Sequence, residues 1–164
     1  MTAATTVRSA TEADAEILAD LFHALFIHYW DAGTPSRSDI TRHVRCDILP
    51  SGCEIVIAER EGRAVGLATF AVLYPGPGIG GQLTMKDLFV TAEARGSGAG
   101  RDLLAHLAKT AIERGCLRFD WTAENNNPEA IAYYDRLGAK RVDEKVYYRV
   151  DGELLKEWAR GAKA

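Results

Sequence analysis

Apolar residues in the first part of the chain recur with the period of a helix. The positions that repeat every three or four residues are Ile17, Leu18, Leu21 and Leu25. This spacing predicts a helix over residues 11–30 with one buried face. Thr11 and the acidic residues after it favour a start there, because side-chain oxygens and negative charge stabilise a first turn. A second helix is predicted over residues 37–49, and it should end near Pro50 and Gly52.

The middle of the chain changes to patterns typical of β-strands. Residues 53–74 contain two apolar runs separated by the sequence REGR, in which the glycine favours a hairpin turn. Proline and glycine dominate residues 75–81, which predicts a loop. The remaining predicted strands are residues 6–10, 82–90, 116–123 and 145–150.

Helical spacing returns in the C-terminal half. Helices are predicted over residues 100–115 and 127–138 and in the tail, residues 152–163. Gly115 and Gly138 stand where the first two should end. A strand–helix–strand unit therefore spans residues 83–122. The sequence predicts an α/β protein with a mixed sheet and helices on both of its faces.

Composition indicates one ordinary globular domain over residues 1–164. Apolar residues make up 47% and charged residues 26% of the 164 positions, which suits a single core. The net charge of -3 gives no general attraction to nucleic acid or to an anionic membrane. No apolar segment follows a basic one at the start, and no apolar run has the length of a bilayer, so we expect a cytoplasmic protein.

The cysteines and histidines do not have the spacing of a metal site. Cys46, Cys53 and Cys116 are odd in number and form no CxxC pair, which favours free thiols. The four histidines show neither HxxxH nor HExxH spacing. We therefore expect no metal cofactor.

The segment ARGSGAGRDLL, residues 94–104, combines three glycines with the start of a predicted helix. The first amides of a helix lack internal partners and lie at the positive end of its dipole, so they bind anions such as phosphate. Glycine at positions 96, 98 and 100 allows the backbone to approach a bulky diphosphate. A glycine-rich turn without a ligand is the other interpretation that this segment alone permits.

Two common phosphate-binding motifs do not fit this segment. A P-loop requires lysine and then serine or threonine after its last glycine, whereas Arg101 and Asp102 follow Gly100. The dinucleotide-binding motif requires a third glycine where Arg101 stands. It also turns almost directly from strand to glycines, whereas residues 91–95 intervene here.

The remaining pattern is R-x-x-G-x-G, formed by Arg95, Gly98 and Gly100. Together with LTMKDLFV before it and LRFDWTAENNN and PEAIAYYDRLGAKRV after it, the chain resembles the GNAT superfamily of acyl-CoA-dependent N-acetyltransferases over nearly its whole length. DLFV, ARGSGAG, AIAYYDRLGA and YRVDGELL are most similar to the spermidine/spermine and thialysine acetyltransferase branch. The resemblance implies the GNAT fold, a mixed, mostly antiparallel sheet with a V-shaped split between two parallel strands.

The resemblance also implies that acetyl-CoA, as cosubstrate, lies in this split. Its pantetheine arm would pair with the end of one strand like an added strand, and its diphosphate would bind the glycine segment. The residues assigned to acetyl-CoA in this way are Leu88, Phe89, Val90, Arg95, Gly96, Ser97, Gly98, Ala99, Gly100, Arg101 and Asn127.

Two residues are implied for the chemistry, which is attack of an amine on a thioester. Tyr134 matches the family's general acid, and its high reference pKa keeps the proton available until a thiolate forms. Helical periodicity alone would make Tyr134 a packing residue, the role that we expect for Tyr133. Asp87, acting through water, is the candidate base, and solvent is the alternative.

Lys86 stands where the polyamine-acetylating branch has a glutamate. Lysine is no carboxylate base, and its charge repels a polycation. Either Lys86 lines the acceptor pocket and favours an amine that also carries an anion, or it points to solvent. The candidate acceptor-contacting residues are His28, Tyr29, Lys86 and Asp87.

The sequence therefore predicts an acetyl-CoA-dependent N-acetyltransferase. The acceptor would be a primary amine of a small molecule, amino acid-like or polyamine-like, that attacks directly in a ternary complex. The alternatives are a protein lysine or N-terminal acetyltransferase and a non-catalytic CoA-binding sensor. The C-terminal VYYRVDGELLKEWA resembles the segment through which the branch dimerises, which implies a homodimer. No nucleic acid or membrane partner is expected.

Overall fold

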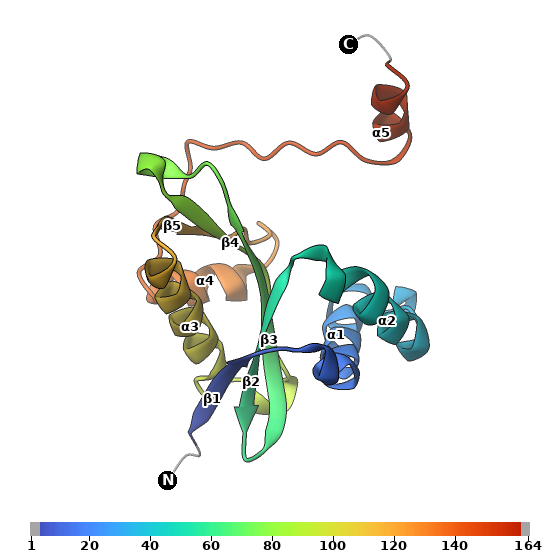
Figure 1. Cartoon of the computed structure of the whole chain (residues 1–164), viewed down its shortest axis with the longest axis vertical. Helices are drawn as coiled ribbons and strands as arrows, with labels where there is room; N and C mark the ends of the chain where they lie inside the picture. The colour runs from blue at the N-terminus through green and yellow to red at the C-terminus, as the bar shows by residue number, and fades with distance from the viewer. Residues whose placement is uncertain (1–3, 162–164) are drawn as a thin grey trace. The chain divides into compact units, whose positions relative to one another are not determined.

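A computed structural model describes residues 4–161, which fall into two compact units (Figure 1). The first unit ends at Thr122 and the second begins at Ala123. The first contains every strand of the described chain, and the second contains two helices. The prediction of a single domain over residues 1–164 stays a prediction.

The first unit is built around a five-stranded sheet in the order β1-β2-β3-β4-β5. Strands β1 to β4 pair antiparallel with their neighbours, and β5 pairs parallel with β4. This confirms the predicted mixed, mostly antiparallel sheet. The strands are β1 Thr5–Ser9, β2 Glu54–Arg60, β3 Arg63–Leu73, β4 Gly81–Val90 and β5 Cys116–Asp120.

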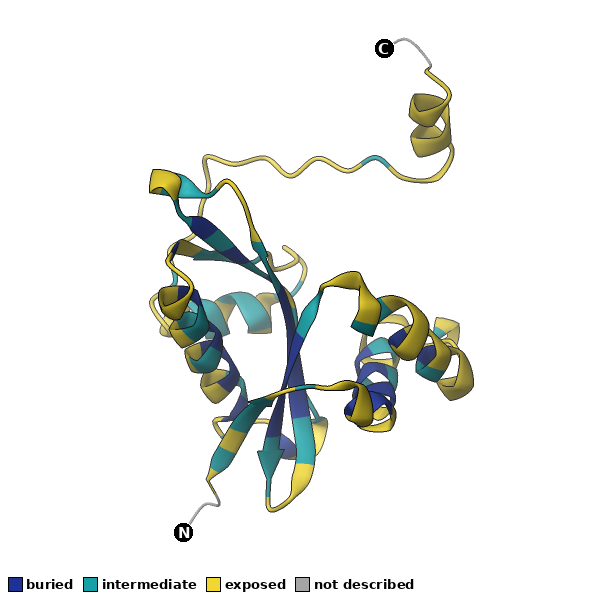
Figure 2. Cartoon of the chain, viewed as in Figure 1, coloured by how far each residue is buried: buried dark blue, intermediate teal, exposed yellow. Residues whose placement is uncertain are grey.

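Helices cover both faces of this sheet (Figure 1). Side chains alternate between faces along a strand, so Ile55 and Ile57 join the core under α1, whereas Val56 and Ala58 are buried on the opposite face. Helix α3 packs along all five strands, and the buried residues lie on the sheet and on the helix sides that face it (Figure 2). The α-helices of this unit are α1 Ala15–Trp30, α2 Arg37–His43 and α3 Ala99–Glu113.

A buried carboxylate fixes the connection from β1 to α1. Asp14 accepts hydrogen bonds from the Arg8 guanidinium at 2.7 and 2.9 Å and from the Thr11 amide at 2.8 Å. Arg8 also pairs with Glu59 of β2. Arg8, followed by Thr11, holds the pKa of Asp14 well below its usual range. Folding therefore favours the charged carboxylate, which anchors the start of α1 to the sheet.

Several predicted elements have different ends in the structure. The helix predicted over residues 37–49 is an α-helix only to His43, and it continues as a π turn, Val44–Ile48, and a 3-10 turn, Leu49–Ser51. Gly52 ends this segment in the left-handed conformation, which is usual for a glycine at the end of a helix. The strand predicted over residues 116–123 stops at Asp120. The further 3-10 turns are Glu12–Asp14, Asp31–Gly33, Pro77–Ile79 and Ala92–Ala94.

The second unit contains α4, Pro128–Arg136, and α5, Gly152–Ala159, both within predicted helices. The last two residues of the predicted tail helix lie outside the described residues. The strand predicted over residues 145–150 is wrong. A strand exists through hydrogen bonds to a neighbouring strand, and no strand lies within the described residues of this unit. Side chains that would have been half buried in a sheet are exposed instead: Val146, Tyr147 and Tyr148.

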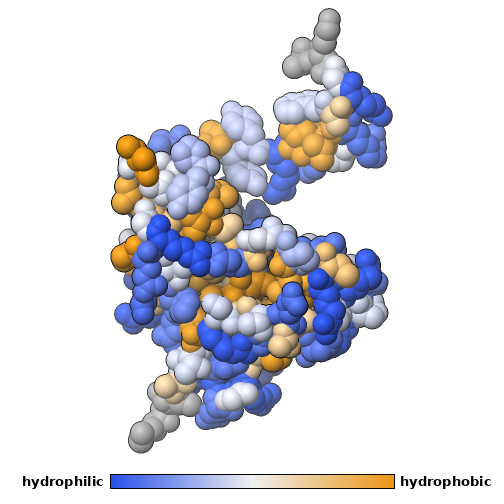
Figure 3. Space-filling model, in the orientation of Figure 1, coloured by the Kyte–Doolittle hydropathy of each residue, from blue (hydrophilic) through white to orange (hydrophobic). Residues whose placement is uncertain are grey.

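Apolar side chains are also exposed on α5, where Figure 3 shows a hydrophobic surface. These side chains are Leu154, Leu155 and Trp158. Neither α5 nor any other helix between residues 4 and 161 combines the length and apolar character that a bilayer span requires.

Candidate active site

The sheet opens between its two parallel strands. Pairing of β4 with β5 runs only from Gly81, opposite Cys116, to Thr84, opposite Asp120. Strand β4 continues to Val90, but beyond Thr84 it pairs only with β3. On the side of β4 away from β3, the backbone groups of residues 85–90 therefore have no strand partner in the first unit. An edge of this kind can pair with an extended ligand as it would with another strand.

The open part of β4 leads into the glycine segment. Gly96 has φ of +78° and Gly98 has φ of +96°, in the left-handed region that L residues rarely adopt. A Cβ at Gly96 would meet nothing within 4 Å, and one at Gly98 would meet only the Asp102 carboxylate at 4.0 Å. Glycine is thus required at both positions by the backbone conformation. The sequence alone could not distinguish this reason from the close approach of a ligand.

The start of α3 carries free amides. The Asp102 amide donates to the Gly98 carbonyl at 3.0 Å, which is the first regular helical bond. In the first unit, the amides of Gly98, Gly100 and Arg101 have no protein acceptor. The exposed side chains of Arg95 and Arg101 add positive charge to the same loop. This arrangement suits an anion with several oxygens.

A β-bulge lies in β4 beside the opening. Thr69 of β3 pairs with Asp87, but the next residue, Phe70, pairs with Met85, so Lys86 is the extra residue. Its side chain is exposed. Bulges redirect side chains and are common next to active sites.

Asp87 is held by a side chain that the sequence analysis missed. The Thr69 hydroxyl donates to Asp87 Oδ2 at 2.6 Å and accepts from the Asp87 amide at 3.1 Å. Thr69 itself is buried. The sequence offered one signal for this contact: Thr69 carries the single hydroxyl in the apolar run GLATFAVL, and a buried hydroxyl requires a polar partner.

The end of α1 lies next to the same part of β4. The ring of His28 is 6.5 Å from that of Phe89, and the Tyr29 ring is 5.3 Å from His28. Asp87 and Phe89 are two residues apart, so their side chains point to one face of the sheet. The structure thus brings His28 to the face that carries Asp87.

Asn127 and Tyr134 belong to the second unit. The Asn127 side chain caps α4 by accepting from the Ala130 amide at 3.1 Å. The rings of Tyr133 and Tyr134 lie 5.4 Å apart on this helix. The predicted approach of Asn127 and Tyr134 to the acetyl group and its carrier stays a prediction.

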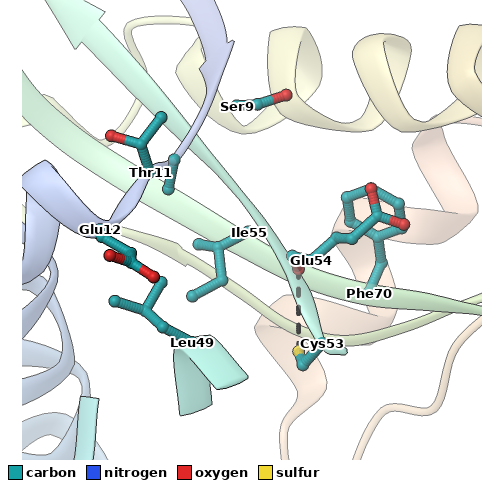
Figure 4. Close-up of a pocket in the computed structure, with 9 residues that line it drawn as sticks. Ser9, Thr11, Glu12, Leu49, Cys53, Glu54, Ile55 and Phe70 are labelled. Atoms are coloured by element: carbon teal, nitrogen blue, oxygen red, sulfur yellow. Dashed lines mark hydrogen bonds between the residues drawn. The ribbon is translucent and has the colours of Figure 1, made fainter. Parts of the chain in front are cut away.

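Two cavities in the first unit are lined by other residues. One, of about 260 Å³, opens at the start of β2 and is lined by Ser9, Ala10, Thr11, Glu12, Leu49, Cys53, Glu54, Ile55 and Phe70 (Figure 4). Burial raises the pKa of the Cys53 thiol, which therefore stays protonated at neutral pH. The other, of about 280 Å³, lies between α1 and α2. None of the predicted site residues lines either cavity.

All three cysteines are free thiols in the structure, as their spacing favoured. Among residues 4–161, no three side chains of the metal-binding types lie close enough together to hold an ion.

A mixed sheet split between two parallel strands, with a glycine-lined helix start beside the split, is the fold of the GNAT acetyltransferases. The chain belongs to that family: the model of the acetyltransferase (GNAT) family matches residues 20–139. This membership confirms the resemblance seen in the sequence.

Individual relatives agree with the branch that the sequence suggested. The thialysine N-epsilon-acetyltransferase of Sus scrofa is 30% identical over 83 residues, which are 49% of this chain and 49% of that protein. The chain thus matches about half the length of this relative. An integron cassette protein from the mobile metagenome of V. cholerae has a TM-score of 0.92 at 34% identity, covering 98% of this chain and 99% of its own.

A solved aminoglycoside N-acetyltransferase in complex with CoA shares the fold. Its TM-score is 0.72 at 18% identity, over 92% of this chain and 97% of its own.

Proposed function

We propose that this protein is an N-acetyltransferase that uses acetyl-CoA to acetylate a primary amine of a small molecule. The observation that carries the proposal is the continuity of two binding features in the first unit. The unpaired edge of residues 85–90 is followed, after a short connection, by the free amides of Gly98, Gly100 and Arg101. An acyl carrier with an extended amide-containing arm and a diphosphate matches both features.

The residues that would hold acetyl-CoA fit its chemistry. Backbone groups of Leu88, Phe89 and Val90 would bind the arm, and the amides of Gly98, Gly100 and Arg101 would bind the diphosphate. The carrier supplies a thioester, whose carbonyl is activated toward amines. The amine nitrogen bonds to the acetyl carbon, and the carbon–sulfur bond breaks.

Proton transfer falls to two side chains in this proposal. Asp87 accepts the amine proton through water, because the Thr69 hydroxyl holds its carboxylate on the face that His28 also borders. Tyr134 donates a proton to the departing sulfur, a role that rests on its match to the family motif. His28 and Tyr29 form one wall of the acceptor site.

A panel of amines tests this function. Purified protein should release free thiol from acetyl-CoA only when a suitable amine is added, with CoA and the acetylated amine formed in equal amounts. Binding of CoA without turnover across the panel would instead identify a sensor. Turnover only with peptides bearing a lysine or a free N-terminus would identify a protein acetyltransferase.

Lys86 should bias the choice of acceptor. It is the exposed extra residue of the bulge, one position from Asp87, so we infer that its charge attracts an acceptor carrying an anion beside its amine. Lys86→Glu should lower kcat/KM for such amino acid-like amines and raise it for diamines. Each change in kcat/KM should be about threefold to tenfold, which corresponds to the interaction free energy of one partly solvated charge pair. An unchanged preference across the panel would mean that Lys86 only faces solvent.

We also propose a homodimer that forms through the C-terminal segment. The exposed side chains of Val146, Tyr147 and Tyr148, together with those on α5, support it, because large apolar side chains that gather on the surface favour a contact with another chain. Light scattering should give twice the chain mass of 17.9 kDa. The mass of a single chain at micromolar concentration would contradict this.

A further inference from the structure

Arg60, the last residue of β2, makes a hydrogen bond to the backbone of the glycine segment. Its Nη1 donates to the Ser97 carbonyl at 2.9 Å and to the Thr5 hydroxyl at 3.3 Å. Ser97 is 37 positions away in the sequence, on the connection from β4 to α3. The guanidinium is partly buried, so this contact ties the sheet to the loop.

The Ser97 carbonyl is the acceptor that the Arg101 amide would use if the helix began one residue earlier. In the structure the regular ladder starts instead with Asp102, whose amide donates to Gly98. Arg60 takes the Ser97 carbonyl, and the Arg101 amide has no acceptor in the first unit. The Arg60 contact thus coincides with a helix start at which the Arg101 amide is left free.

We propose that Arg60 is a positioning residue for the diphosphate site. By holding the Ser97 carbonyl, it keeps the following Gly98 in its left-handed conformation and leaves the Arg101 amide open to an anion. This inference rests on the proposed function, since it assigns Arg60 to the same acetyl-CoA site. Arg60 needs no contact with the ligand itself, and its charge behind the loop adds to the attraction of an anion.

Arg95 has a different position. Its Nε donates to the Val90 carbonyl at 3.4 Å, at the end of β4, and its side chain is exposed. The bond of Arg95 therefore stays within the β4–α3 connection and is exposed, whereas Arg60 joins this connection to β2. Only the loss of Arg60 should change the backbone that presents the amides.

The test compares Arg60→Met and Arg60→Lys with Arg63→Met. Arg63 faces Arg60 across the β2–β3 hairpin, is exposed and makes no side-chain hydrogen bond or ion pair among the described residues, so it is a matched control. The first readout is the Kd of CoA by calorimetry for each protein. The second is kcat/KM with S-acetylpantetheine, which lacks the diphosphate, and the third is the melting temperature.

Arg60→Met should raise the Kd of CoA about tenfold, the usual effect of one lost charge-assisted hydrogen bond. The KM for acetyl-CoA should rise by the same factor with kcat unchanged, and kcat/KM with S-acetylpantetheine should stay at the wild-type value. Arg60→Lys should recover part of the affinity, because an ammonium still donates to one carbonyl. Arg63→Met should match the wild type.

Two outcomes overturn the inference while the proposed function stands. One is wild-type affinity for CoA in Arg60→Met. The other is an equal loss with acetyl-CoA and with S-acetylpantetheine, which would show only a general effect on the fold. If Arg60→Met does not fold, Arg60→Lys carries the same comparison with a smaller shift. Wild-type protein that binds no CoA would overturn the proposed function and the inference together.

Discussion

Gly98→Ala should lower kcat/KM for acetyl-CoA about 10- to 100-fold, chiefly through KM. Gly98 has φ of +96°, and a side chain there forces either a strained backbone or a different loop. Strain of this kind costs about 1–3 kcal/mol, which corresponds to one or two orders of magnitude in affinity. The loss falls on acetyl-CoA because the adjacent amides would hold its diphosphate. Steady-state kinetics with varied acetyl-CoA, and calorimetry with CoA, measure it.

Gly62→Ala is the matched control for Gly98→Ala. Gly62 lies in the β2–β3 turn with φ of +72°, and a Cβ there would meet nothing within 4 Å, whereas one at Gly98 would meet only the Asp102 carboxylate at 4.0 Å. Both variants should lose similar stability, as judged by the melting temperature, but Gly62→Ala should keep the wild-type KM. Equal KM values in the two variants would refute a ligand-binding role for the glycine segment.

Tyr134→Phe should lower kcat by about 10²- to 10⁴-fold, the usual range for loss of a positioned proton donor. The substitution removes only the hydroxyl, so the Kd of CoA should stay at the wild-type value. Stopped assays with acetyl-CoA and the best amine of the panel measure kcat, and calorimetry measures Kd.

Tyr133→Phe provides the comparison for this change, because Tyr133 is the neighbouring tyrosine on α4 and is predicted to pack. It should retain most of the activity. If Tyr134→Phe turned over at the wild-type rate, or if the two variants were equally impaired, the general acid would have to lie elsewhere.

The fold of the first unit was predictable because its signals are local. Helical spacing in α1 and α3, strand runs in β2 to β4 and the glycines at turns act within short segments, so the sequence shows them directly. The strand predicted over residues 145–150 failed for the opposite reason. Its alternation of apolar and aromatic residues is local, but a strand needs a partner that the same segment does not contain.

The candidate site was predictable in part. The sequence placed the glycine segment at a helix start, and the structure adds that Gly96 and Gly98 are required by their backbone conformation. The sequence did not show the hydrogen bond of Thr69 with Asp87 or that of Arg60 with Ser97, because these contacts join residues 18 and 37 positions apart. Only the antiparallel register of β3 with β4 and the packing of the loop on β2 bring these pairs together.

A crystal structure of the protein with CoA tests the central claim most directly. We expect the diphosphate to lie within hydrogen-bond distance of the amides of Gly98, Gly100 and Arg101, and the pantetheine arm to lie beside residues 85–90 of β4. A diphosphate bound at another surface, with these amides facing only water, would contradict it.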